Sequence, residues 1–161
     1  MTPFRAREPF DWGSVLRLIQ SEFACMAGRI NPPSSILRLS KAALADLAAM
    51  AQQGEVWILG HPPIACMVLT PRKDALYVGK LAVATDQRGR GLARVLMAVA
   101  EGRASSRGLT VLELEARVEL LENQAAFVAM GFVEVGRKAH AGFDQATSIT
   151  YRRKVGDGVG E

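Results

Sequence analysis

The sequence has few cysteines and no long apolar run. Among its 161 residues only Cys25 and Cys66 carry thiols, and they lack the paired spacing of a metal or redox motif, so we expect two buried thiols. No apolar segment approaches the roughly 18 residues of a membrane span. The N-terminal residues lack the apolar core and cleavage site of a signal peptide. These absences predict a cytoplasmic protein with no metal and no membrane partner.

The chain also lacks a strong excess of either charge. Twenty basic residues face 16 acidic ones, giving a net charge of +4. This balance permits an anionic partner, but the single short basic cluster carries no interleaved aromatic residues, so nucleic acid is not expected. The length fits one domain, which we place at 1–155, followed by a flexible tail at 156–161. The sequence leaves open whether the protein is a monomer or a homodimer.

Glycine and proline residues mark the ends of the helices and strands that the sequence predicts. Residues 2–7 can form a short edge strand. Asp11 can cap a helix that ends near Gly28 and carries one apolar face, formed by Trp12, Val15, Leu16, Ile19, Phe23 and Met26. A second helix is expected to open at Ser40 and to end before Gly54.

The middle of the chain alternates strands with a helix. Segments 55–60, 64–70 and 75–83 are typical of strands, and the short turns between them predict an antiparallel meander. A helix to about Arg107 and a strand at 109–115 come next. A strand, a helix and a strand in this order predict a parallel pair joined by a right-handed crossover.

The last third is expected to contain a helix at 122–130 and two antiparallel strands at 132–138 and 147–155. The predicted fold is therefore α/β (α+β): a mixed, mostly antiparallel sheet of about six or seven strands with a central parallel β-α-β crossover and helices on both faces.

The stretch DQRGRGLARVLM, residues 86–97, leaves a strand and enters a helix. The first N–H groups of a helix have no partner within it, and the helix dipole makes them attractive to phosphate. Gly89 and Gly91 let the backbone turn tightly and approach a ligand. The spacing fits neither the P-loop nor the dinucleotide-binding fingerprint.

Residues 88–93 match the pattern [Q/R]-x-x-G-x-[G/A], and ENQAAFVAMGF follows at 122–132. In these motifs and in element order, the chain resembles the GNAT superfamily of acetyl-CoA-dependent N-acetyltransferases. The resemblance implies transfer of acetyl from acetyl-CoA to a primary amine, directly within a ternary complex. It also implies a cofactor site in which backbone N–H groups hold the pyrophosphate of coenzyme A, formed by Arg88, Gly89, Arg90, Gly91, Leu92 and Ala93.

The resemblance further implies that Leu81, Ala82 and Val83 pair with the pantetheine arm and place an N–H near the thioester carbonyl, where it would stabilise an oxyanion. Asn123 would contact pantetheine. Arg90 and Arg94 are either phosphate contacts or solvated charges.

The sequence departs from the family at Phe127, where many members have a tyrosine that protonates the departing thiolate. We expect Phe127 to pack beside pantetheine. Either Tyr151, Tyr77 or a water replaces the acid, or the thiolate leaves unassisted, which a thiol pKa near 8.5 tolerates. The loss also keeps open an alternative: a coenzyme A sensor without catalysis.

The general base and the acceptor contacts are not given by the motif. Glu113, Glu115 and Glu119 are the candidate bases, and Lys80 on the neighbouring strand either pairs with a glutamate, meets solvent or borders the acceptor channel. Loop position suggests acceptor contacts at Arg29, Asn31 and His140.

Overall fold

The computed structural model describes residues 1–26, 28–29 and 41–156. Within this part, seven strands form one sheet in the order β1-β2-β3-β4-β5-β7-β6. Along the chain the elements are β1 (Phe4–Ala6), α1 (Trp12–Met26), α2 (Lys41–Gln53), β2 (Glu55–Leu59), β3 (Ala65–Pro71), β4 (Leu76–Val83), the 3₁₀ turn η2 (Thr85–Gln87), α3 (Leu92–Ser106), β5 (Val111–Arg117), α4 (Leu121–Ala129), β6 (Val133–Lys138) and β7 (Ser148–Lys154).

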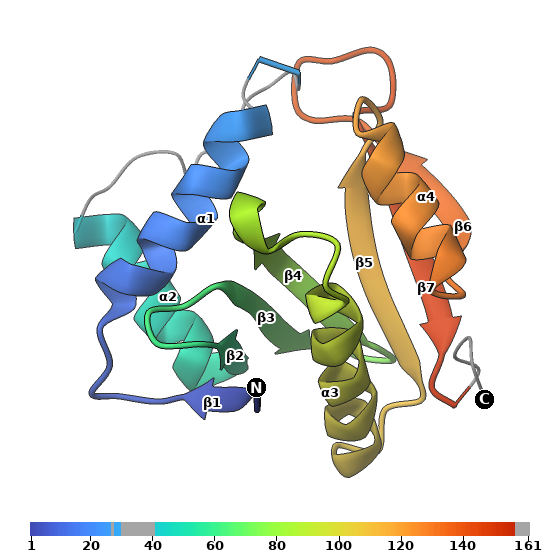
Figure 1. Ribbon diagram of the computed structural model, residues 1–161. Coiled ribbons are helices and arrows are strands. Elements are labelled where there is room, and N and C mark those ends of the chain that lie inside the picture. Colours follow the sequence, from blue (N-terminus) through green and yellow to red (C-terminus); the bar gives the residue numbers. More distant parts are fainter. Residues whose placement is uncertain (27, 30–40, 157–161) are drawn as a thin grey trace.

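The sheet confirms the predicted topology. Strands β1 to β4 form an antiparallel meander, β5, β7 and β6 form a second antiparallel group, and the two groups meet through the parallel pair β4–β5. Helix α3 makes the crossover between these two strands (Figure 1). The predicted strand at 109–115 lies two residues later, at Val111–Arg117.

Both faces of the sheet are covered by helices, as predicted. Alternate residues of β3 point to opposite faces. Ala65, Met67 and Leu69 join a core cluster with α3 and α4, whereas Cys66 and Val68 join one with α1 and α2. Strand β3 is therefore held between two apolar layers.

Helix α1 begins where the sequence predicts. The Asp11 carboxylate accepts a hydrogen bond from the Ser14 N–H at 3.3 Å, the geometry of an N-cap. The helix ends at Met26, close to Gly28. The expected start of the second helix at Ser40 lies outside the described residues, and its end before Gly54 is confirmed.

No helix in the described ranges is both long and apolar enough to cross a membrane. Those ranges also contain no group of three or more His, Cys, Asp or Glu side chains arranged to hold a metal ion.

Candidate functional site

The site begins where the parallel strands separate. β4 and β5 pair only through Leu76 with Leu112 and Tyr77 with Glu113. Beyond these residues the two strands diverge (Figure 1). The divergence leaves two adjoining hollows, which we call the inner cavity, about 230 Å³, and the loop groove, about 490 Å³.

The two hollows share part of their walls. Met26, Leu81, Asn123 and Phe127 line both of them. A molecule lying in the loop groove can therefore present one end to the inner cavity at these four side chains.

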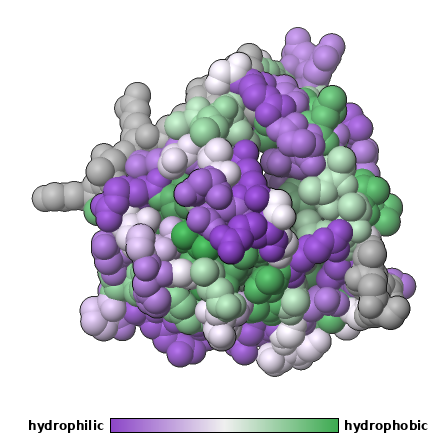
Figure 2. Space-filling view, viewed as in Figure 1, coloured by the Kyte–Doolittle hydropathy of each residue, from purple (hydrophilic) through white to green (hydrophobic). Residues whose placement is uncertain are grey.

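The glycine-rich turn borders the loop groove. Gly89 and Gly91 have φ values of 77° and 76°, in the left-handed region that favours glycine. Gly91 is the N-cap of α3 and supplies no side-chain hydrogen bond to the first turn of the helix. In Figure 2, hydrophilic residues gather at the centre of this face, over the segment from η2 into α3. An uncapped helix N-terminus beside an open groove is suited to an anion.

The arginines of the turn have different surroundings. Arg94 lines the groove. Arg90 is exposed and donates to the Gln87 amide oxygen. Arg88 also lines the groove, and its guanidinium binds the carboxylate of Glu22, a residue of α1 that is only 3% exposed. Glu22 was not among the predicted site residues, although an acidic residue on the apolar face of a helix is a signal.

A bulge interrupts β4 at the junction of the two hollows. Val68 pairs with Gly79 and Cys66 pairs with Ala82, so Lys80 and Leu81 together face Met67. Lys80 has a φ of 50°, which is uncommon for a residue with a side chain. A bulge disrupts the ladder and leaves backbone groups unpaired. It lies where the resemblance to GNAT enzymes places the N–H for the thioester carbonyl.

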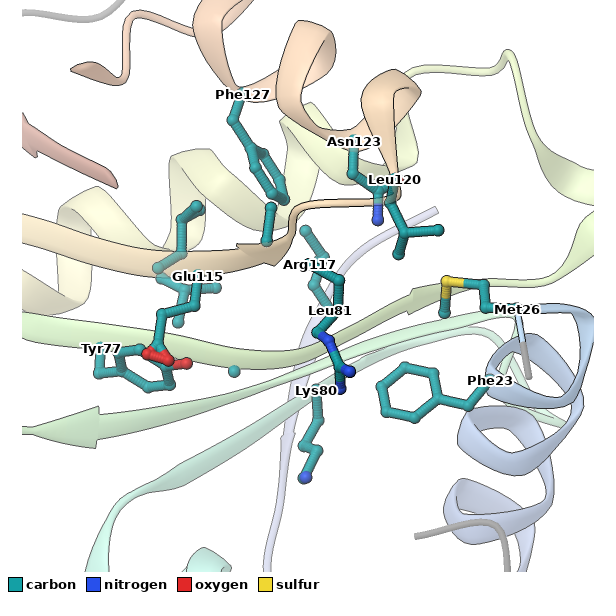
Figure 3. A pocket seen from close by; sticks show the side chains of 14 residues that line it. Phe23, Met26, Tyr77, Lys80, Leu81, Glu115, Arg117, Leu120, Asn123 and Phe127 are labelled. Carbon is teal, nitrogen blue, oxygen red and sulfur yellow. The ribbon is translucent and has the colours of Figure 1, made fainter. Parts of the chain in front are cut away.

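The inner cavity combines apolar walls with a polar end. Phe23 and Met26 of α1 lie at one side, and Phe127 and Asn123 of α4 lie at another (Figure 3). Tyr77 and Glu115 lie side by side away from α1, at the β4–β5 end.

The two candidate glutamates of β5 have different environments. Glu113 is buried and binds Arg72 and Arg152 at 2.6 and 2.7 Å, and neither hollow includes it in its walls. Glu115 lines the inner cavity, with 18% of its side chain exposed and Lys138 Nζ at 2.7 Å. Of the two, Glu115 is placed to meet a molecule in the cavity.

Lys80 also lines the inner cavity, but its side chain points away from Phe127 and Asn123 (Figure 3). Burial lowers the pKa of its ammonium, and Asp46 partly offsets this. Lys80 forms no ion pair with Glu113 or Glu115 in the described part of the chain; Glu113 binds Arg72 and Arg152, and Glu115 binds Lys138.

The two candidate acids, Tyr77 and Tyr151, have different positions relative to Phe127 and to the two hollows. Phe127 lies in the walls of both the inner cavity and the loop groove. Tyr151 is 3% exposed, packs with its ring centroid 6.1 Å from that of Phe127, and belongs to neither wall. Tyr77 borders the inner cavity, and burial, with Glu115 as the next cause, raises its pKa to about 12.

The predicted acceptor contacts do not all come together. Arg29 lines the loop groove and binds Glu122 through two hydrogen bonds, which hold the pKa of that carboxyl at about 2. His140 lies between β6 and β7, where its ring contacts the Thr147 hydroxyl outside both walls. Asn31 lies outside the described residues.

The expectation of two buried thiols is half wrong. Cys66 is buried, and burial raises its pKa to about 12. Cys25 is exposed and lines the loop groove, because its position on α1 lies off the apolar face.

Comparison with known proteins identifies this architecture. The model of the Acetyltransferase (GNAT) family matches residues 19–132. Among solved structures, a GNAT-family acetyltransferase from Staphylococcus aureus has a TM-score of 0.71 at 14% identity, with 96% of this chain and 98% of that chain covered. No curated protein sequence matches the chain.

The names of two further solved structures specify a substrate or a bound ligand. The ribosomal-protein-S18-alanine N-acetyltransferase of Escherichia coli has a TM-score of 0.67 at 18% identity, covering 96% of this chain and 94% of its own. A GNAT acetyltransferase of Elizabethkingia anophelis, solved with acetyl-CoA bound, has a TM-score of 0.66 at 15% identity, covering 95% and 97%. At these identities the likeness shows the fold.

Proposed function

The chain belongs to the GNAT acetyltransferase family, and from that premise we propose that it moves an acetyl group from acetyl-CoA to a primary amine by direct transfer in a ternary complex. One observation carries the proposal: the loop groove, bordered by the glycine-rich turn, joins the inner cavity at Leu81, Asn123 and Phe127. Donor and acceptor can therefore meet without leaving the protein.

The loop groove is the donor site in this proposal. Backbone N–H groups of residues 88–93 bind the diphosphate of coenzyme A, supported by the dipole of α3 and by Arg94. Pantetheine then runs along Leu81 to Val83 and passes Asn123. This course places the thioester at the junction of the two hollows.

At the junction, an N–H of the β4 bulge stabilises the oxyanion that forms when the amine attacks. Lys80 and Leu81 supply this bulge, and its position next to both hollows supports the role. In enzymes where one such donor has been removed, the transition state lost about 3 to 4 kcal/mol of stabilisation.

The inner cavity is the acceptor site. An amine arrives as ammonium and must lose a proton before it attacks, and Glu115 is the carboxylate on the cavity wall that can take it, directly or through a water. The nitrogen then bonds to the acetyl carbon, and the bond from that carbon to sulfur breaks.

Coenzyme A leaves as a thiolate without a phenol from α4. Phe127 has no proton to give, and the pKa of Tyr77, at about 12, lies well above the roughly 8.5 of a thiol, so proton transfer from Tyr77 to the thiolate is uphill. The thiolate takes its proton from water after departure. The apolar ring of Phe127 instead packs beside pantetheine.

Calorimetric titration with acetyl-CoA tests donor binding, and thiol release across an amine panel tests transfer. The panel contains free amino acids, aliphatic and aromatic amines, and a peptide that begins with alanine, because the name of the E. coli neighbour specifies an alanine of ribosomal protein S18. We expect binding, and thiol release with at least one amine. Binding without turnover on any amine would instead support the coenzyme A sensor, and absence of binding would overturn both functions.

A further inference from the structure

Glu22 is a charged residue on the face of α1 that is otherwise apolar. Its neighbours on that face, Val15 and Ile19, are fully buried, and Glu22 itself is 3% exposed. A carboxylate at such a position is costly unless other groups compensate it. Its partners therefore indicate what the residue does.

Both partners of Glu22 belong to the turn that precedes α3. One carboxylate oxygen accepts a hydrogen bond from the Thr85 hydroxyl at 3.0 Å, and the other binds the Arg88 guanidinium. Thr85 opens η2 and Arg88 follows it directly. A single buried carboxylate thus holds the two ends of the turn to α1.

The same helix shapes the rest of the site. Met26, one turn after Glu22, lines both hollows, and Glu22 lines the loop groove. Gly89 comes directly after Arg88 and Gly91 follows two residues later, and both glycines adopt left-handed conformations. Glycine is the most flexible residue, so a fixed point next to these glycines limits the directions in which their N–H groups can point.

We propose that Glu22 is a positioning residue for the donor site: it fixes the turn at Thr85 and Arg88 so that the N–H groups of residues 88–93 face the diphosphate of coenzyme A. This inference rests on the proposed function. In this proposal Glu22 does not contact coenzyme A. Arg88 has two tasks in this proposal. It completes the anchor, and it neutralises the Glu22 carboxylate, which would otherwise face the dianionic diphosphate of coenzyme A.

A purely electrostatic role makes the opposite prediction. If charge alone mattered, removing the Glu22 carboxylate would leave the Arg88 cation uncompensated and would strengthen the binding of an anionic ligand. If positioning matters, the same removal loosens the turn and weakens binding. The direction of the change separates the two accounts.

The first experiment compares Glu22→Ala with Asp86→Ala by calorimetric titration with coenzyme A. Asp86 is an exposed acid of the same turn, so its removal changes the charge by the same amount and leaves the contacts of Glu22 in place. We expect Glu22→Ala to bind about tenfold more weakly, the usual scale for losing a hydrogen bond to a charged group. Asp86→Ala should stay within about twofold of the wild type.

A double-mutant cycle tests the two tasks of Arg88. Arg88→Gln leaves the carboxylate in the groove wall without its cation, so it should bind coenzyme A more weakly than the double variant Glu22→Gln with Arg88→Gln. Rescue of binding by the second substitution is the expected result. If Arg88 acted only by direct contact with phosphate, the second substitution would restore nothing.

Urea unfolding of the ligand-free variants separates folding from positioning. Thr85→Val, which removes one hydroxyl at the surface end of the anchor, is the second variant should Glu22→Ala fail to fold, and we expect it to weaken binding a few-fold. Tighter or unchanged binding by folded Glu22→Ala, or by Thr85→Val, would overturn the role of Glu22. A wild-type protein that bound no coenzyme A would overturn the proposed function itself.

Discussion

Gly91 is a single residue on which the proposed binding of coenzyme A in the loop groove depends. Its φ of 76° suits glycine, and a Cβ placed there would meet no atom within 4 Å. Space is therefore available for a larger side chain, and what limits substitution is backbone strain together with the chemistry of the added group.

Gly91→Asp should abolish coenzyme A binding. It sets a carboxylate against the diphosphate, and a like-charge contact costs several kcal/mol, which is at least about a hundredfold in affinity. Gly91→Ala is the matched control, because it adds about 1 to 2 kcal/mol of strain without charge.

Arg90→Ala should weaken coenzyme A binding only modestly, since the Arg90 side chain donates to Gln87. Calorimetry measures all three, and strong binding by Gly91→Asp would refute the placement of the diphosphate.

Glu113 and Glu115 offer a matched pair on one strand. Glu115→Gln should lower kcat by about a hundredfold or more, as for loss of a general base, with coenzyme A binding unchanged. Glu113→Gln should instead lower the free energy of unfolding, because it breaks the pairs with Arg72 and Arg152, and should affect kcat less. Steady-state kinetics and urea unfolding distinguish them. A larger kcat loss for Glu113→Gln would reassign the base.

Single residues also show which features of the site were predictable from the sequence. The turn at 88–93 was predictable because its backbone chemistry depends on glycine spacing within a few residues. The pairing of Glu22 with Thr85 was not predictable, because 63 residues separate the two in the sequence. The exposure of Cys25 was predictable, because position 25 lies off the apolar face of α1 that the sequence itself indicates.

At the scale of elements, β2 and α3 are joined by a buried carboxylate. Glu55 of β2 is fully buried and accepts hydrogen bonds from Trp57, Arg103 and Arg107 at 2.7 to 2.8 Å. Burial alone would raise its pKa, but these hydrogen bonds outweigh burial and hold the pKa at about 2. The cluster fixes the end of α3 opposite to the glycine-rich turn.

This cluster predicts a pH dependence of stability. The folded pKa lies below the unfolded value of about 4.3, so the contribution is complete above that value and is lost as the pH falls toward 2. Glu55→Gln should destabilise the protein by about 3 kcal/mol at pH 7 and flatten the decline between pH 4.5 and 2. Urea unfolding across this range measures both. An unchanged pH profile in Glu55→Gln would contradict the assignment.

The positions of strands and helices were predictable from apolar periodicity and from glycine and proline, because both signals depend on residues that are close in the sequence. The β4 bulge at Lys80 did not, since LYVGKLAV is typical of an unbroken strand and the bulge arises from pairing with β3. The divergence of β4 and β5 likewise depends on the whole sheet. The resemblance to the GNAT superfamily, rather than the strand pattern, implied a site at that place.

At the scale of the whole molecule, the proposed direct transfer, rather than a covalent acetyl-enzyme, rests on the two adjoining hollows and on the positions of the cysteines. Cys66 is buried with a raised pKa, and Cys25 lies in the wall of the loop groove but not in that of the inner cavity. Initial-rate kinetics with both substrates varied should give intersecting double-reciprocal lines. Parallel lines, together with an acetyl adduct on Cys25 in the intact mass, would indicate a ping-pong route instead.

A crystal structure of the protein with acetyl-CoA would show where the diphosphate and the thioester of coenzyme A lie. We predict that diphosphate oxygens accept hydrogen bonds of about 2.7 to 3.2 Å from backbone N–H groups of residues 88–93, with the thioester at the junction beside Leu81 and Phe127. A diphosphate bound away from this turn, or a thioester outside the junction of the two hollows, would contradict the account.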